Sequence, residues 1–172
     1  MTTTRPGPRE DHRPHPALAT VLLGIGLGGF FDGIVLHQIL QWHHLLSAHL
    51  PSDSLENLEI NTLADGMFHA ATWVFTVAGV FLLYRSVRDG ASLHWRGLMG
   101  GLLAGWGGFN VVEGLINHQL LGLHRVRPGP DEVLYDLGFL VWGATMLVAG
   151  AVLLRGHGPA SSPPRDTARD SG

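Results

Sequence analysis

The sequence contains no cysteine among its 172 residues, and this absence removes a whole class of chemistry. Without cysteine there can be no disulfide, no thiolate nucleophile and no cysteine-ligated metal or iron–sulfur site. Lysine is also absent, so all 11 basic residues are arginines and no lysine can form a Schiff base. A metal ion held by side chains would therefore depend on histidine and carboxylate groups.

Charge of either sign is scarce. Charged residues make up 15% of the chain, against about 25% in a typical soluble domain. The net charge is −3 and there is no basic stripe, so the sequence offers nucleic acid no binding surface. The few charged residues gather near the two ends and in short connectors, and long apolar stretches separate them.

Four apolar stretches have the length of transmembrane helices, since about 20 residues suffice to cross the hydrocarbon core. They cover residues 18–46, 63–84, 98–121 and 133–154. The first is longer than needed, which predicts a tilt, a kink or an extension beyond the bilayer. We therefore predict an all-α membrane protein, with a four-helix transmembrane domain over residues 17–155 and disordered cytoplasmic tails over residues 1–16 and 156–172.

The arginines predict the orientation of these spans. Three arginines lie in the N-terminal segment, three in the connector between the second and third spans, and three in the C-terminal tail, whereas the first connector has none. Because arginine and lysine accumulate on the cytoplasmic side, both termini are expected in the cytoplasm. The first and third connectors would then face outward from a multi-pass protein of the inner (plasma) membrane.

A polar pattern occurs twice in the chain, with an offset of 81 positions. Residues 32–43 and residues 113–124 both read acid–Gly–x3–His–Gln–x–Leu–x2–His. A weaker second repeat has an offset of 71 positions and pairs Asp65 and Phe68 with Asp136 and Phe139. The pattern predicts two helical hairpins that enter the membrane from the same side, as parallel repeats of one bundle.

The repeated acids and histidines fall mainly in the outer half of the predicted spans. A charged group at the bilayer centre costs at least about 2.5 kcal/mol, so several of them in one layer predict mutual pairing, a cation or a water-filled cavity. We predict a metal site formed by seven side chains. They are Asp32, His37, Asp65, His69, Glu113, His118 and Asp136. Five further side chains are predicted to support the site or to lie at the membrane interface. They are Gln38, His43, His44, Gln119 and His124.

The spacing of the acids and histidines permits a metal site without requiring one. Asp32 and His37 are five residues apart, as are Glu113 and His118. In a regular helix five residues correspond to about 140° of rotation, so the two side chains of each pair diverge. A local bulge at the following glycine would bring each pair together. Imidazole and carboxylate ligands suit copper, zinc or iron.

Three other functions are compatible with the same residues. His37 and His118 could clamp a haem between two helices, which would make the protein an electron carrier. The acids and histidines could instead form a proton or ion relay, or the protein could be a non-catalytic membrane scaffold whose polar groups only join helices. The sequence contains no nucleophile–base arrangement, so its status as an enzyme stays open.

The segment GFFDGIVLHQILQWHH, residues 29–44, resembles the signature of an uncharacterised bacterial family of predicted membrane proteins, and residues 113–119 resemble it again. The likeness extends over residues 18–154 and implies four membrane helices. It also implies a place beside cytochrome oxidase copper-assembly proteins, and hence metal handling or respiratory-complex assembly with a respiratory or metal-trafficking partner. His124 is followed by Arg125, where a second histidine is expected, so a fully symmetric site is not expected.

Overall fold

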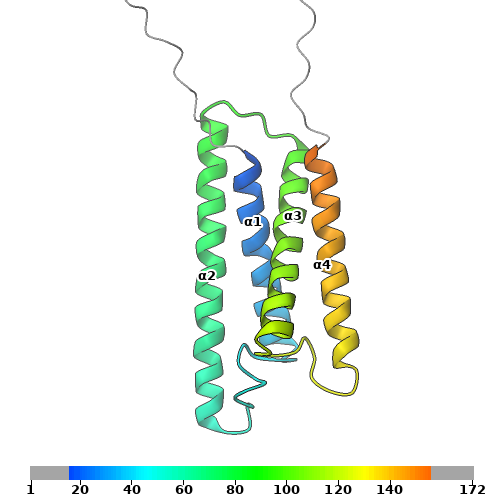
Figure 1. Cartoon of the computed structure of the whole chain (residues 1–172). Helices are drawn as coiled ribbons and strands as arrows, with labels where there is room; N and C mark the ends of the chain where they lie inside the picture. The colour runs from blue at the N-terminus through cyan, green and yellow to red at the C-terminus, as the bar shows by residue number, and fades with distance from the viewer. Residues whose placement is uncertain (1–15, 156–172) are drawn as a thin grey trace, which may run out of the picture.

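The computed structural model describes residues 16–155, and within this range the regular structure is entirely helical (Figure 1). Two segments are π-helices that continue an α-helix and are labelled η. The elements are α1 (Pro16–Phe31), η1 (Asp32–Ile39), α2 (Leu55–Arg88), α3 (Trp95–Glu113), η2 (Gly114–Leu120) and α4 (Glu132–Arg155). The tails predicted to be disordered, apart from residue 16, lie outside the described residues.

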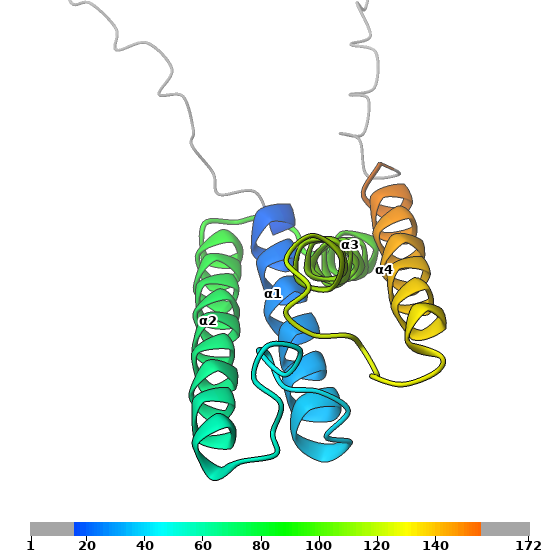
Figure 2. The same ribbon diagram turned by 60° about the horizontal axis from the view of Figure 1, so that its bottom comes forward.

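The four long helices stand side by side in the order α2, α1, α3, α4 (Figures 1 and 2). The central pair α1 and α3 pack against each other, while α2 packs on α1 and α4 packs on α3. The connectors of residues 40–54 and 121–131 lie at the end of the molecule where η1 and η2 finish. The connector between α2 and α3 lies at the opposite end.

Apolar side chains cover the outside of the outer helices. The continuous helix Pro16–Ile39, α2 and α4 are each long and apolar enough to cross a membrane. Only 11% of the most apolar window of α2 and 17% of that of α4 is buried inside the protein. Because so much apolar surface stays exposed in the folded chain, these helices are suited to contact with lipid. The inner helix α3 does not meet the same criterion, and the four-span count stays a prediction.

Glycines bring the central helices into close contact. A Cβ atom at Gly105 would lie 2.0 Å from the carbonyl oxygen of Val21, and one at Gly101 would lie 1.8 Å from Oγ1 of Thr20. Small residues at such crossings allow the close backbone approach that is typical of membrane helices. Gly97, four residues before Gly101, has no neighbour within 4 Å of its Cβ position, although its carbonyl accepts a hydrogen bond from Thr20.

The first helical segment is shorter than predicted, because it ends at Ile39 and not at Leu46. Gln41 adopts a left-handed conformation with φ of 50°, and the N–H of Trp42 donates to the carbonyl of Leu36, which turns the chain out of the helix. The second helix is longer than predicted. It begins at Leu55, where the Ser54 side chain accepts a hydrogen bond from the N–H of Asn57 and caps the first turn.

The two π-helices occupy matching positions in the repeated pattern. The N–H of Leu40 donates to the carbonyl of Val35, and the N–H of Leu121 donates to that of Ile116, both at 2.8 Å. In such a segment the hydrogen bond spans five residues instead of four. Residues five apart therefore lie one above the other, which brings the acid and the histidine of each pattern onto the same face.

Candidate metal centre

Four histidine rings meet at the end of the bundle where the π-helices finish. His37 comes from η1, His118 from η2, and His43 and His124 from the two connectors that follow. All four are at most 3% exposed. The ring centroids of His37 and His43 are 4.4 Å apart, those of His43 and His124 are 4.5 Å apart, and those of His124 and His118 are 4.7 Å apart.

The two connector histidines are held by hydrogen bonds across the molecule. Nδ1 of His43 lies 2.7 Å from the carbonyl oxygen of Val126, and Nδ1 of His124 lies 3.0 Å from that of Leu45. A carbonyl oxygen can only accept, so each Nδ1 carries the proton and donates it. In the neutral ring Nε2 is then an unprotonated nitrogen with a free lone pair, and in both histidines this atom faces the middle of the cluster.

The outer ring nitrogens of the π-helix histidines face carboxylates from the outer helices. Nδ1 of His37 lies 2.9 Å from Asp65 on α2, and Nδ1 of His118 lies 3.5 Å from Asp136 on α4. The backbone N–H of Leu45 donates to Asp65. Asp136 has equivalent contacts, since it accepts from the N–H of Val126 and from Arg125 and Gln119. Both aspartates therefore lie outside the ring cluster, with most of their acceptor capacity used.

Two further carboxylates complete the cluster from within. Nε2 of His37 lies 3.4 Å from Asp32, and Nε2 of His118 lies 3.1 Å from Glu113. Nε2 of His124 lies 3.0 Å from Glu113 and 3.1 Å from Nε2 of His118. Asp32 is 2% exposed and Glu113 is 5% exposed. Imidazole nitrogens and carboxylate oxygens thus face one another in a space closed to solvent.

Several of these inward atoms have no hydrogen-bond partner within the described part of the chain. They are Oδ2 of Asp32, Nε2 of His37, Nε2 of His43 and Oε2 of Glu113. Buried polar atoms without partners are rare in folded proteins and call for a ligand, a proton or an ion. Two sets of three ligand atoms lie within 4.8 Å of one another, one from His37, His43 and His124 and one from Glu113, His118 and His124.

The charge state of His43 favours a role as a ligand. Burial, together with the neighbouring imidazoles of His124 and His37, lowers the pKa of His43 to about 3. The ring is therefore neutral at physiological pH, and its Nε2 lone pair is free to bind a cation.

The remaining predicted residues lie around the cluster. His69 is in neither set of ligand atoms. Its Nε2 is buried without a hydrogen-bond partner and lies against Gly33, where a Cβ atom would approach it to 2.4 Å. Nδ1 of His44 donates to Oδ2 of Asp65 at 2.7 Å. The repeat places a leucine, Leu140, at the position of His69, and this leucine packs on Gly114 in the same way.

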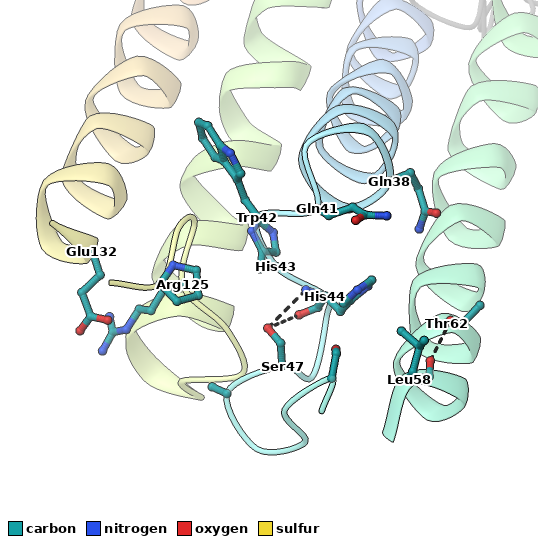
Figure 3. Close-up of a pocket in the computed structure, with 13 residues that line it drawn as sticks. Gln38, Gln41, Trp42, His43, His44, Ser47, Leu58, Thr62, Arg125 and Glu132 are labelled. Atoms are coloured by element: carbon teal, nitrogen blue, oxygen red, sulfur yellow. Dashed lines mark hydrogen bonds between the residues drawn. The ribbon is translucent and has the colours of Figure 1, made fainter. Parts of the chain in front are cut away.

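A polar hollow of about 810 Å³ opens beside the cluster on the connector side (Figure 3). Its walls come from η1, both connectors and the first turns of α2 and α4. Figure 3 shows Gln38 and Thr62 on one side and Arg125 and Glu132 on the other. His43 lines the hollow as well as the cluster, so one ring of the cluster borders this opening.

A comparison with protein families identifies the class of this protein. Residues 19–157 match the model of the family described as "Predicted membrane protein (DUF2243)". The chain therefore belongs to this family of membrane proteins, whose function is not known. No curated protein and no solved structure matches the chain, so the site has to be interpreted from its own geometry.

Proposed function

We propose that this protein binds transition-metal ions at the histidine–carboxylate cluster. Six side chains supply the ligand atoms. They are His37, His43, His118 and His124 through Nε2, and Asp32 and Glu113 through their carboxylates. One observation carries the proposal: His124 must donate through Nδ1 to the carbonyl of Leu45, and yet its Nε2 lies 3.0 Å from the carboxylate of Glu113. Two acceptors at that distance need a proton or a metal ion between them.

The distances support a metal ion in this role. Metal–nitrogen and metal–oxygen bonds of about 2.0–2.2 Å, at angles of 90–110°, place neighbouring ligand atoms about 3.0–3.5 Å apart. The contacts of His124 and His118 with Glu113, at 3.0 and 3.1 Å, fall in this range, as does the 3.4 Å contact of His37 with Asp32. The ligand atoms therefore already have the separations expected of neighbouring ligands of one metal ion.

The outward contacts support the same assignment. Metal-binding histidines almost always donate their second ring N–H to a carboxylate or a backbone carbonyl, which fixes the ring and raises its basicity. His43 and His124 contact carbonyls in this way and His37 contacts Asp65, whereas Nδ1 of His118 faces Asp136 at 3.5 Å without a hydrogen bond. We therefore propose that these two aspartates orient ligands, and that His43 and His124 bind the ion directly.

The repeated pattern suggests two ions. Asp32, His37 and His43 belong to the first copy of the pattern, and each has a counterpart at the same position of the second copy. Two histidines and one carboxylate form a common ligand set for iron, and helical bundles build two-metal sites from such sets. We propose that the two hairpins are parallel repeats and that each supplies one half of a centre for two ions of iron, zinc or copper.

A haem between His37 and His118 is less well supported. The rings of His43 and His124 fill the space between them, with centroids 4.4 Å from His37 and 4.7 Å from His118, respectively. A haem would have to displace both rings and break their hydrogen bonds to the connector backbone. The geometry therefore favours individual metal ions.

The position of the cluster supports an exchange of ions with the outer side of the membrane. With four spans and cytoplasmic termini, as the arginines predict, the hollow beside His43 opens away from the cytoplasm. We propose that the protein, in the inner (plasma) membrane, handles metal ions for a respiratory or metal-trafficking partner that docks there. The relay and the scaffold remain the alternatives to be tested.

Elemental analysis of detergent-purified protein tests the proposal. We expect bound metal in the wild type and a strong loss in His43→Ala and in His124→Ala, because each removes an inward lone pair. His49→Ala is the matched control, because His49 is an exposed histidine in the same connector as His43. Absence of metal from the wild type under every loading condition would contradict the proposal and leave the relay and the scaffold.

A further inference from the structure

A second hollow reaches the cluster from the side of the helices. It has a volume of about 360 Å³ and lies between α1, α2 and α3, within the range of about 300–1,000 Å³ that small-molecule sites occupy. We refer to it as the lateral groove. Apolar side chains form most of its lining. They are Ile25, Phe68, Phe75, Phe109, Val112 and Ile116.

The lateral groove ends on a carboxylate of the cluster. Glu113 lines the groove and also belongs to one of the two sets of ligand atoms. It is 5% exposed, and its Oε2 lies 3.1 Å from Nε2 of His118 but forms no hydrogen bond within residues 16–155. Asn117, one turn further along η2, is the other polar side chain of the lining. The groove therefore has a long apolar part and a short polar end next to the proposed ions.

The opposite face of the molecule provides a comparison. A hollow of about 280 Å³ lies there, and Phe31, Leu36 and Phe139 line it at positions that the repeat pairs with Val112, Asn117 and Phe68 of the lateral groove. No acid or histidine of the cluster lines that hollow. Of these two hollows, only the lateral groove borders a carboxylate of the cluster.

The lining defines the chemistry of an occupant. The rings of Phe68 and Phe109 have centroids 6.0 Å apart and offer surfaces on which a planar ring can pack. The carboxylate of Glu113 can accept a hydrogen bond from a hydroxyl group, and the amide of Asn117 can donate or accept one. The apolar faces of the flanking helices are exposed, so a molecule dissolved in the membrane can enter from the side.

We infer that the lateral groove binds a membrane-soluble hydroxylated ring of the quinol class, with its hydroxyl directed at Glu113. The approach of this molecule to metal ions rests on the proposed function, but its binding in the groove does not. The centre would then lie between two routes, a polar hollow at His43 for ions and the lateral groove at Glu113 for a lipid-soluble molecule.

A binding experiment with a short-chain benzoquinol on the purified full-length protein tests the inference. Val112→Trp fills the groove and should weaken binding at least about tenfold, which corresponds to about 1.4 kcal/mol. Val141→Trp is the matched control, because Val112 and Val141 are both 57% exposed and Val141 lines neither hollow. Ile116→Trp provides a second test should Val112→Trp fail to fold.

Two results would overturn the inference. One is equal binding by the groove variants and Val141→Trp, and the other is equally good competition by a saturated alcohol of the same length, which would indicate an unspecific acyl-chain slot. Metal content, measured on the same samples, separates this inference from the proposed function. Metal without groove-dependent quinol binding contradicts only the inference, whereas groove-dependent binding by a protein that never holds metal contradicts only the metal proposal.

Discussion

At the residue scale, the role of each buried histidine depends on which of its ring nitrogens already donates a hydrogen bond. Nδ1 of His43 and Nδ1 of His124 are committed to backbone carbonyls, so Nε2 is the atom left for an ion. Asp65 has both oxygens in contact with donors, because it faces His37, His44 and the N–H of Leu45. The imidazoles are therefore expected to bind ions directly, and Asp65 is expected to orient the ring of His37.

Replacing Asp65 by asparagine distinguishes these two roles. Asp65→Asn keeps the size of the side chain and removes its charge, so the His37 ring faces a neutral amide, a weaker orienting acceptor, but keeps its inward nitrogen. We expect metal affinity to fall about 10- to 100-fold, as it does when supporting carboxylates are changed, with the full number of ions still bound at saturation. Metal titration of the purified variant measures both quantities. A reduced number of ions at saturation would mean that Asp65 is itself a ligand.

Sequence reasoning identified the buried residues better than their roles. The repeat pointed to all of Asp32, His37, Glu113 and His118, because both copies place them at equal positions. His43 and His124 are the last positions of the same pattern, but they lie beyond the helices, and their direction depends on how two connectors cross. Only the hydrogen bonds to Val126 and Leu45 reveal that these rings turn inward.

At the scale of elements, each π-helix brings an acid and a histidine that are five residues apart onto the same face of the helix. In a regular helix Asp32 and His37 would point about 140° apart, whereas η1 brings their side chains to 3.4 Å. The sequence indicated this only through Gly33 and Gly114, which follow the two acids. Neither the length of the π-helical segments nor the early end of the first helix at Ile39 could be derived from hydropathy, because leucines and a tryptophan recur among the polar residues as far as Leu46.

The contact between α1 and α3 sets the distance between the two halves of the centre. Gly105→Leu places a side chain against the backbone of Val21, with the Cβ atom 2.0 Å from its carbonyl oxygen. Because backbone cannot move aside cheaply, we expect a loss of at least about 2 kcal/mol in the free energy of unfolding. Thermal unfolding in detergent measures this loss through the midpoint temperature.

Gly97→Leu is the control for this substitution, since it lies on the same helix and has no neighbour within 4 Å of its Cβ position. A leucine there should be neutral or slightly stabilising, because leucine favours helix more than glycine does. Equal unfolding temperatures for the two variants would contradict the close packing of α1 on α3.

At the scale of the whole molecule, the open question is how many times the chain crosses the membrane. Three helical segments meet the criterion of length and hydropathy and α3 does not, because glycines, Asn110 and Glu113 make it less apolar. Its position between α1 and α4 reduces its contact with lipid, so a lower hydropathy is compatible with a span. Four crossings place the connectors of residues 40–54 and 121–131 on one side and residues 89–94 on the other.

Cysteine labelling can test this topology directly, because the chain has no cysteine of its own. We expect an impermeant thiol reagent to label Ser52→Cys and Pro130→Cys in cells whose outer membrane, where present, has been made permeable. Ser92→Cys should react only after the inner membrane is broken. Labelling of Ser92→Cys and Pro130→Cys from the same side would show that α3 does not cross.

The central claim is that imidazole nitrogens of both connectors bind the same group of metal ions. X-ray absorption spectroscopy at the edge of the bound metal tests it most directly, because outer-shell scattering from imidazole rings reports histidine ligands. We predict a shell of nitrogen and oxygen ligands with about two histidines per ion, and fewer histidines in His43→Ala. A shell of oxygen ligands without imidazole, or an unchanged spectrum in His43→Ala and in His124→Ala, would contradict the account.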